Sequence, residues 1–307
     1  MIRLKAIELS KDPQYDIPAG QFKASNHWCQ RFMKRNGLSL QQKTTLAHRL
    51  PPDYEEKIVQ FRKYVIRQRQ AHNYPLHLVG NMDEVPVQFD MLSNRTVKAV
   101  GDKTVKIRTT GNEKNRLTVV LACAGDGSKL KPLVIFKLKT MPKIQNKHGV
   151  TVQEKGWMDS ETMKIWIEKV WRARIGVLSR RRSLLVFDSF EAHKTEQVKG
   201  SLKSENTDLS VISGGLTSVL QPLDICLNKP IKDRLRQRWM TWMAEGIHEL
   251  TPTGRQKKPS KELMCQWISE AWREIPREMV ARSFLKCGIT NSLDGSEDNL
   301  VFDSSSD

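Results

Sequence analysis

The chain has 307 residues, of which 38% are hydrophobic, so it is long enough to bury a core and is not a disordered chain. Its formal charge of +17 favours a polyanionic partner, most commonly nucleic acid, although a basic but otherwise ordinary soluble protein has the same balance. Its five cysteines are scattered without C-x-x-C spacing, which argues against a zinc module or a disulfide framework. A secretory signal and an apolar run of about 18 residues are both missing, so we expect no membrane partner.

The N-terminal segment is basic and shows helical periodicity. Residues 2–9 predict a short first helix, and residues 23–36 predict a second, because Ala24, Trp28 and Phe32 fall on one helical stripe. Two short helices separated by a turn with proline and glycine favour a small all-α helix-turn-helix domain over residues 1–50, although a helical cap with a solvated charged face fits the same pattern. The basic side chains off the stripe, which would contact DNA, are Lys23, Arg31, Lys34 and Arg35.

Two segments flank the region that we predict as the main domain. Residues 51–75 predict a connector helix, because Pro51-Pro52 can open it and Asp53 can cap its first turn. Residues 291–307 carry five acids and no base and end in Ser-Ser-Ser-Asp, so they predict a disordered acidic tail.

The central region, residues 76–290, alternates between short apolar runs and amphipathic stripes. The apolar runs predict strands at 78–82, 117–124, 132–136, 184–187 and 209–212. The stripes predict helices after Asp159, near 194–202, after Pro222 and over 263–275. Three antiparallel strands followed by β-α-β crossovers predict an α/β fold, a ribonuclease-H-like mixed sheet flanked by helices.

Three acids in this region stand where a strand ends or a helix begins. Asp83 and Asp188 each follow a predicted strand, and Asp224 lies in the first turn of the helix that Pro222 opens. A carboxylate at the mouth of a buried strand is well placed to hold a metal ion and poorly placed for packing. Structural alternatives remain for all three: Asp224 suits the helix dipole, and Asp188 can cap a turn. Glu84 could be the ligand in place of Asp83.

Together the three acids suggest a two-metal site for phosphoryl transfer. Cleavage and transfer of a DNA strand use two divalent ions about 4 Å apart, one on each side of the reacting phosphorus. Magnesium prefers oxygen ligands and keeps several waters, so three carboxylates can serve two ions. Neighbouring strands lie about 5 Å apart, so carboxylates on two strand ends and one helix can converge on such a pair.

The remaining candidates are groups that could contact phosphate. The basic segment 98–116 supplies Lys106, Arg108, Lys114 and Arg116, and a second basic face spans 229–238. Contacts of this kind make binding salt-dependent and largely independent of sequence. His193 could contact phosphate or orient a water, although a histidine bonded within the fold is an equal alternative.

At these residues the chain resembles the pogo-like transposases, the Tigger, Jerky and centromere-protein-B relatives with a DDE superfamily endonuclease domain. Residues 22–39 look like the second helix-turn-helix of a centromere-protein-B-type DNA-binding region. Four further passages look like successive signatures of the endonuclease domain: Asn81-Met-Asp83-Glu84, residues 110–118, Asp188-Ser-Phe-Glu-Ala-His193 and Leu220-Gln-Pro-Leu-Asp224.

The resemblance implies that Asp83, Asp188 and Asp224 are the catalytic triad and the metal ligands, with magnesium or manganese as the cofactor. It also implies a nuclear protein that binds double-stranded DNA, with a homodimer and chromatin or transcription factors as further candidate partners. Two departures matter. The family usually carries two tandem helix-turn-helix units, and only the second is found here. Ser189 stands where many members have asparagine.

Three functions follow as hypotheses. The first is a domesticated DNA-binding protein with little or no nuclease activity, which the missing half of the DNA-binding region favours. The second is an active metal-dependent transposase that cuts and joins DNA strands, which the complete triad favours. The third is a protein-interaction scaffold, which the tryptophan-rich segment 263–275 and the acidic tail suggest.

Overall fold

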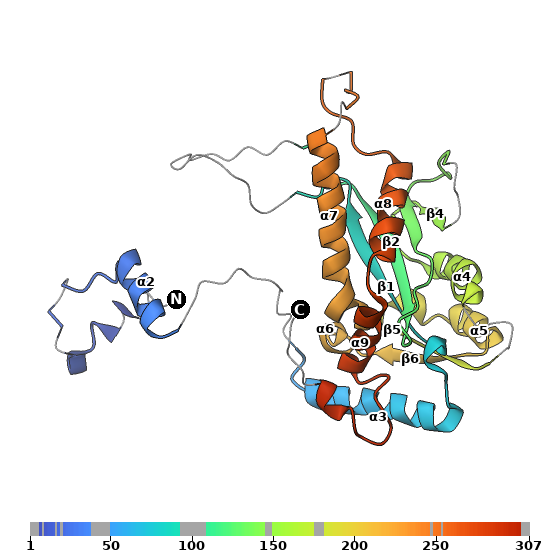
Figure 1. Ribbon diagram of the computed structural model, residues 1–307, viewed down its shortest axis with the longest axis horizontal. Coiled ribbons are helices and arrows are strands. Elements are labelled where there is room, and N and C mark those ends of the chain that lie inside the picture. The colour runs from blue at the N-terminus through green and yellow to red at the C-terminus, as the bar shows by residue number, and fades with distance from the viewer. Residues whose placement is uncertain are drawn as a thin grey trace. The chain divides into compact units, whose positions relative to one another are not determined.

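The structure is a computed structural model, and its chain divides into two compact units, Met1–His48 and Arg49–Asp307 (Figure 1). It describes residues 6–7, 9–15, 17–18, 21–37, 50–92, 109–144, 149–174, 181–245, 248–252 and 254–301. The helix predicted over residues 2–9 lies mostly outside these ranges, as do Lys106 and Arg108. None of the described helices is long and apolar enough to cross a membrane.

The smaller unit contains the helix predicted over residues 23–36. This helix, α2, spans Asn26–Arg35, and the Ser25 hydroxyl caps it by accepting the N–H of Trp28 at 3.1 Å. Trp28 stacks on Phe32 with ring centroids 5.3 Å apart and meets Phe22 edge-on at 4.9 Å. A short 3-10 turn, η1, precedes it at Pro13–Tyr15. The aromatic stripe of the sequence is therefore the packed side of α2.

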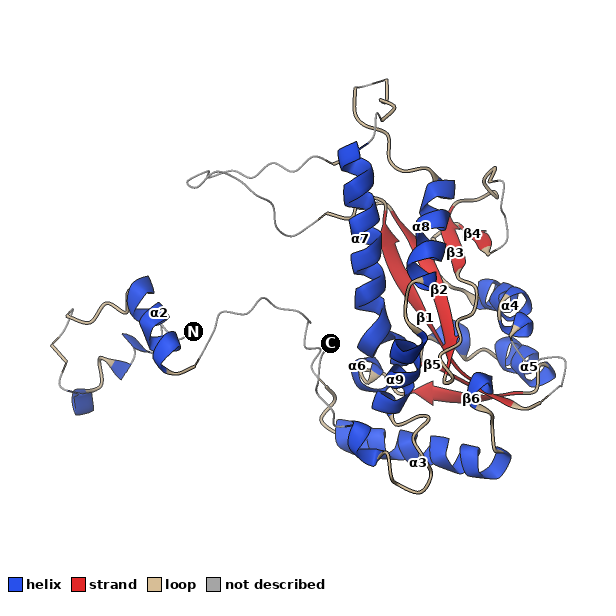
Figure 2. Ribbon diagram, viewed as in Figure 1, coloured by secondary structure: helices blue, strands red, loops and turns tan. Residues whose placement is uncertain are grey.

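The larger unit is built on one mixed six-stranded sheet in the order β4-β3-β2-β1-β5-β6 (Figure 2). Its strands are β1 Val79–Gln88, β2 Arg116–Ala124, β3 Leu133–Lys137, β4 Val150–Gln153, β5 Ser183–Asp188 and β6 Thr207–Ile212. The first three strands are antiparallel, whereas β5 runs parallel to β1 and β6 parallel to β5. The predicted ribonuclease-H-like arrangement, a meander followed by parallel strands, is confirmed.

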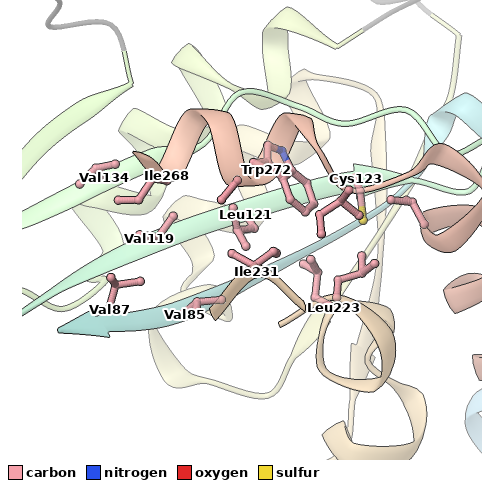
Figure 3. Close-up of a cluster of buried hydrophobic side chains, with 14 of the residues drawn as sticks. Val85, Val87, Val119, Leu121, Cys123, Val134, Leu223, Ile231, Ile268 and Trp272 are labelled. Carbon is pink, nitrogen blue, oxygen red and sulfur yellow. The ribbon is translucent and has the colours of Figure 1, made fainter. Parts of the chain in front are cut away.

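Helices cover both faces of the sheet (Figure 1). On one face lie α7 Asn228–Glu245, α8 Lys261–Arg273 and α9 Arg277–Cys287, and on the other α4 Ser160–Lys169 and α5 Glu196–Ser204. The larger apolar cluster gathers alternate residues of β1 and β2, such as Val85 and Leu121, under Ile231 and Trp272 (Figure 3). Trp272 is therefore buried within the unit and is not part of a free surface for another protein.

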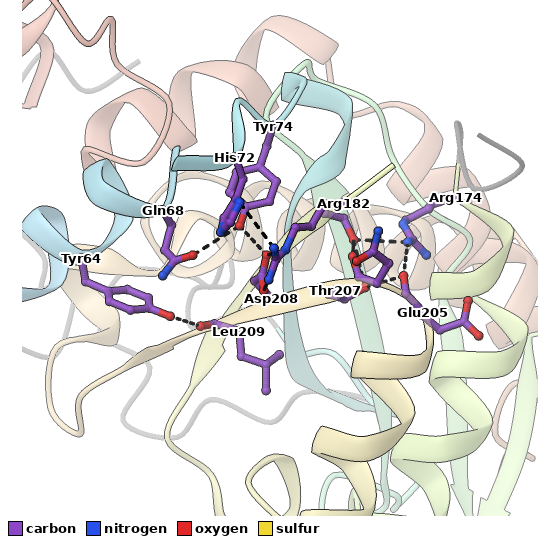
Figure 4. A network of polar contacts seen from close by, with 12 residues as sticks. Tyr64, Gln68, His72, Tyr74, Arg174, Arg182, Glu205, Thr207, Asp208 and Leu209 are labelled. Carbon is purple, nitrogen blue, oxygen red and sulfur yellow. Dashed lines mark hydrogen bonds and ion pairs between the residues drawn. The ribbon is translucent and has the colours of Figure 1, made fainter. Parts of the chain in front are cut away.

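The predicted connector helix packs onto the larger unit. This helix, α3 Tyr54–His72, buries Phe61 and Val65 in the larger apolar cluster. At its far end the hydroxyl of Tyr74 donates to Asp208, which also accepts two hydrogen bonds from Arg182 (Figure 4). This network fastens α3 to β6 at the edge of the sheet.

Two arginines of α3 bind the last segment of the chain that the structure describes. Arg62 donates to the carbonyl of Cys287 at 3.4 Å, and Arg69 donates to the carbonyls of Ile289 at 3.1 Å and Asn291 at 2.6 Å. The segment continues into a 3-10 turn, η7 Asp298–Val301. The first part of the predicted disordered tail is thus folded, and residues 302–307 lie outside the described residues.

Three elements differ from the sequence predictions. β1 does not end near Met82 but continues to Gln88, because Val85 and Val87 alternate with exposed residues and pair with β2. The short strand β4 was not predicted. The long helix after Pro222 begins as a turn of π-helix, η6 Leu223–Leu227, before α7, and a four-residue helix, α6 Thr217–Leu220, precedes it.

Candidate functional site

Two of the three candidate acids lie on neighbouring parallel strands. The register of β1 and β5 pairs Asn81 with Val186, so Asp83 and Asp188 follow two residues further along their strands. Side chains two residues apart point to the same face, which here is the face that α7 covers. The sequence predicted that both acids follow the end of a strand. Asp83 instead lies within β1, whereas Asp188 is the last residue of β5.

Asp224 reaches the same face from the π-helical turn η6. A buried network of amides fixes this turn against β1: Asn81 accepts the N–H of Leu223 at 3.2 Å and donates to the side chain of Gln221 at 3.0 Å. Gln221 in turn donates to the carbonyl of Met82 at 2.9 Å. A fully bonded buried network specifies one arrangement, because any other leaves polar atoms unpaired. Asn81 and Gln221 therefore set where Asp224 stands.

Asn228 joins two of the acids. It lies four residues after Asp224, and its side-chain amide donates to Asp83 Oδ2 at 2.9 Å and to Asp224 Oδ1 at 2.8 Å. Its own side-chain oxygen is buried and has no hydrogen-bond partner in the described part of the chain. Buried polar atoms are nearly always paired, so this oxygen is an unused acceptor beside two carboxylates.

The surroundings of Asp83 disfavour its negative charge. Burial raises its pKa well above the ordinary value, and the charge of Asp224 raises it further. The hydrogen bond from Asn228 opposes these effects but does not overcome them. Glu84 and Asp188 add to the repulsion. A cation at this position would therefore be favoured.

Asp188 lies in the opposite environment, because His193 pairs with it. The buried His193 ring places Nδ1 2.9 Å from Asp188 Oδ1 and Nε2 2.9 Å from Glu84 Oε1. Burial favours the neutral imidazole, but the two carboxylates outweigh it and raise the pKa of His193 to about 9. Burial likewise opposes ionisation of Asp188, but its contacts with His193 lower the pKa of this acid below its ordinary value.

The donors at this site suit a hard divalent cation. Carboxylate oxygens are the ligands that magnesium and manganese prefer, and the repulsion at Asp83 and the unused oxygen of Asn228 both favour a cation. In the part of the chain that the structure describes, no three His, Cys, Asp or Glu side chains have the spacing of a metal centre. The amide of Asn228, and not a third acid, connects Asp83 with Asp224.

Sequence reasoning missed the residues that hold this site together. Asn228 could have been found from its i, i+4 spacing to Asp224, which places the two side chains on one helical face. Asn81 and Gln221 are the polar residues that interrupt apolar runs next to Asp83 and Asp224. The pairing of His193 with Glu84 joins residues 109 positions apart, so no local pattern shows it.

The candidate phosphate contacts divide into two groups. The four basic residues named on α2 and just before it are exposed, as are Lys114 and Arg116 at the start of β2. On α7, by contrast, Arg238 pairs with Glu274 at 2.5 Å and Arg236 with Asp233 at 2.5 Å. The basic face predicted over residues 229–238 is therefore partly neutralised within the protein.

The fold is that of ribonuclease-H-like transposase catalytic domains. Two solved structures of the Mos1 transposase, a paired-end complex with the left transposon end and a mariner paired-end complex with Mn, each match with a TM-score of 0.57 at 12% identity. The first match covers 92% of this chain and 71% of that one, and the second covers 98% and 78%. At this identity the likeness concerns the fold alone.

The chain belongs to the DDE superfamily endonuclease family, which matches residues 114–284 and so includes Asp188 and Asp224 but begins after Asp83. The Tc5 transposase DNA-binding domain matches residues 1–42. Together with the pogo-element relatives described next, these matches confirm the predicted resemblance to pogo-like transposase-derived proteins and the helix-turn-helix character of the N-terminal segment.

Curated relatives extend the likeness along the chain. The human "Pogo transposable element with KRAB domain" is 38% identical over 301 residues, which are 97% of this chain and 49% of the relative. "CENP-B homolog protein 2" of Schizosaccharomyces pombe is 24% identical over 307 residues, which cover 94% of this chain and 55% of the relative. The chain thus spans about half the length of these relatives.

Proposed function

We propose that this chain is a nuclear DNA-binding protein, derived from a pogo-like transposase and domesticated, with little or no nuclease activity. Its partner is double-stranded DNA, which the smaller unit contacts through α2. Homodimerisation and an association with chromatin or transcription factors belong to the same proposal. The exposed basic side chains around α2 carry it: Lys23, Arg31, Lys34 and Arg35 form no ion pair with any acid in the described part of the chain.

Unpaired cations on a short helix suit the phosphate backbone of DNA. Each phosphate that a lysine or arginine neutralises releases a bound counterion, so affinity falls steeply as salt rises. The stacked rings of Trp28 and Phe32 keep the other part of α2 packed, which holds the basic side chains in place. For the larger unit, the partners of the acids support a reduced nuclease activity. His193 pairs with Asp188, and the amide of Asn228 donates to both Asp83 and Asp224.

The test of DNA binding is the double variant Lys34→Ala, Arg35→Ala, with a mixed-sequence duplex as the probe. If both residues contact phosphates, affinity falls and the slope of log K against log salt becomes shallower by about 2. The matched control is Lys164→Ala with Lys199→Ala, a half-buried and an exposed lysine that pair with glutamates on α4 and α5. An unchanged slope in the α2 variant, or an equal change in the control, contradicts the assignment.

A second candidate function is metal-dependent cleavage and joining of DNA strands. Burial and the charge of Asp224 raise the pKa of Asp83, and a bound cation would relieve the repulsion between these acids, which favours this function. Asp83, Asp188 and Asp224 would hold magnesium or manganese, which when bound activates a water or a hydroxyl and stabilises the leaving oxygen. In that case Asn228 orients the two carboxylates of Asp83 and Asp224, and His193 holds Asp188 in place.

Calorimetric titration with magnesium, followed by a DNA nicking assay, decides between the two functions. Saturable binding and nicking in the wild type, both lost in Asp188→Ala, establish the second candidate and contradict the proposal of little or no nuclease activity. Duplex binding without nicking, in magnesium or manganese, supports the first. Nicking that persists in Asp188→Ala contradicts the assignment of the triad.

A further inference from the structure

A groove at one end of the sheet of the larger unit is lined by cations and contains an exposed tryptophan. Its volume is about 380 Å³, and it lies where β2 begins and β3 ends. Six lysines and arginines line it and no acid does: Lys114, Arg116, Lys137, Lys155, Lys258 and Lys261. None of the six pairs with an acid in the described residues, which sets this groove apart from the arginines of α7.

Trp157 stands at the side of this groove in a rigid turn. The side chain of Gln153 accepts the N–H groups of Lys155 at 2.6 Å and Trp157 at 3.3 Å. The carbonyl of Gly156 accepts a hydrogen bond from Thr118 at 2.8 Å, which ties the turn to β2. Gly156 has a φ of +73°, and a Cβ there would lie 2.9 Å from Lys137, so glycine is required in this close turn. The backbone that carries Trp157 is therefore fixed by hydrogen bonds to Gln153 and to β2.

The aromatic rings of the groove already interact with cations of this chain. The guanidinium of Arg116 lies 4.5 Å from the centroid of the Trp157 ring, and the ammonium of Lys258 lies 4.3 Å from that of Phe89. Arg116 leaves much of the indole uncovered, since Trp157 remains 52% exposed. A large exposed apolar side chain among unpaired cations is costly in the free protein and useful for a ligand that has both flat rings and negative charge.

Mutual repulsion among the cations points to an anion as the missing partner. Partial burial of its ammonium group lowers the pKa of Lys258, and the charge of the neighbouring Lys261 lowers it further, while the charge of Asp90 opposes both effects. Lys258 and Lys261 therefore disfavour each other's charge. The adjoining hollow of about 790 Å³ differs, because Lys257, which lines it, is paired with Glu249 at 2.7 Å. The fold holds several positive charges close together, and phosphates bound among them would relieve their mutual repulsion.

We propose that this groove binds single-stranded DNA, with one base stacked on Trp157 and the backbone phosphates paired with the cations that line it. Base stacking on an aromatic side chain and phosphate contacts along a basic groove are the two features of single-strand binding that does not depend on sequence. The cross-strand register pairs Gln88 with Arg116 and Asp83 with Leu121, so the groove begins about 17 Å along the sheet from Asp83.

The groove belongs to the larger unit, whereas the proposed function assigns the duplex to α2 of the smaller unit. The inference rests on that proposed function only in taking DNA as the nucleic acid. Full-length protein is tested with two labelled probes, a thymidylate oligomer and a mixed-sequence duplex, by fluorescence anisotropy. Trp157→Ala weakens binding of the oligomer about 5- to 100-fold, the loss expected for one stacked base, and leaves duplex binding unchanged.

Two further variants separate stacking from charge. Trp157→Phe restores most of the affinity for the oligomer, because it keeps an aromatic face. Lys258→Gln with Lys261→Gln makes the salt slope for the oligomer shallower by about 1.4, as two single-strand phosphate contacts require. Trp157 and Lys258 are exposed, and thermal unfolding of each variant confirms that the fold is retained.

Three results overturn the inference: a wild type that does not bind the oligomer, a Trp157→Ala variant that binds it as tightly as wild type, or equal losses for both probes. The last result would make the groove part of a duplex surface. The variant Lys34→Ala, Arg35→Ala distinguishes this failure from that of the proposed function. If that variant keeps its duplex affinity while Trp157→Ala loses the oligomer, α2 is the wrong assignment and the groove stands.

Discussion

Asp83 and Asp188 occupy equivalent positions on adjacent parallel strands, yet their surroundings drive their ionisation in opposite directions. The pKa of Asp83 is raised by burial and by Asp224, whereas contacts with His193 lower the pKa of Asp188. The sheet places both carboxylates, but it does not determine their charge. That is decided by the element that lies over each strand: a helix with another acid and an amide over Asp83, and a short turn with a histidine beside Asp188.

The positions of Asp83 and Asp188 and their charges therefore have different structural causes. Strand register brings two acids together at little cost, and a third, from the π-helical turn, adds the repulsion. Asn228 reduces this repulsion between Asp83 and Asp224, and the single charge of His193 is shared by Asp188 and Glu84. Each of these two residues can be removed, and the consequences measured in the absence of metal differ in size and in pH dependence.

The largest loss of stability is expected when His193, the partner of Asp188, is replaced. His193→Leu removes the imidazole that the half-buried carboxylates of Asp188 and Glu84 share, which costs up to about 3–5 kcal/mol of unfolding free energy in chelator-treated protein. His193→Gln, which can still donate a hydrogen bond, costs less. Urea unfolding followed by fluorescence measures both. Equal losses in the two variants would mean that packing of the ring, and not its charge, is what the fold requires.

The effect of His193 also has a predicted pH dependence. Its pKa is about 9 in the folded chain and about 6.5 when unfolded, so its charge stabilises the fold fully below pH 6.5, and this contribution is lost as pH rises through about 9. The difference in stability between wild type and His193→Gln should therefore shrink as pH rises from about 6.5 to about 9. A difference that stays constant from pH 6 to pH 10 would show that the imidazole is neutral in the fold.

A smaller loss is expected at the amide. Asn228→Ala removes two hydrogen bonds to carboxylates, and we expect a loss of about 1.5–3 kcal/mol in unfolding free energy without metal. Manganese or magnesium should reduce this loss, because a cation between Asp83 and Asp224 relieves the same repulsion. Asn115→Ala, at an exposed asparagine, is the control. If the divalent ion stabilises wild type and Asn228→Ala equally, the amide and the cation do not act on the same charges.

The smallest expected effect is a change in melting temperature, and its sign should differ between a variant of Asp83 and a variant of Asp188. In chelator, Asp83→Asn should raise the melting temperature by about 2–4 °C, the shift for roughly 1 kcal/mol in a domain of this size, because it removes a repelled charge. Asp188→Asn should lower it. The gain at Asp83 should vanish as pH falls through 3.8, since the folded pKa lies above the unfolded one and wild-type Asp83 is neutral in both states below that pH. A change of the same sign in both variants would contradict the comparison.

Much of the larger unit follows from hydrophobic periodicity, because β2, β3 and β5 are nearly continuous apolar runs that cannot face water. The end of β1 was misplaced because Asp83 and Glu84 interrupt its apolar pattern, although Val85 and Val87 continue it on the far side. β4 has only four residues and pairs at the edge of the sheet, so its pattern is too short to identify.

The three acids could be selected from the sequence, whereas their relationships could not. The bridge from Asn228 to Asp83 spans 145 positions and depends on a π-helical turn, which leaves no sequence signature. The groove at Trp157 was missed for a similar reason, since Arg116, Lys137 and Lys258 come from separate elements. The two groups of basic residues look alike in sequence, and only the fold shows which are already paired with acids.

The contacts that Arg62 and Arg69 make with residues 287–291 show that the boundaries of a sequence family and of a cooperative folding unit need not coincide. The family match runs from 114 to 284, yet the first helix of the unit precedes it and the carbonyls that this helix binds follow it. A fragment trimmed to the match would lack β1, and with it Asp83. One trimmed at 284 alone would leave two guanidinium groups without acceptors. The smallest piece worth expressing therefore begins near residue 50 and extends past residue 291.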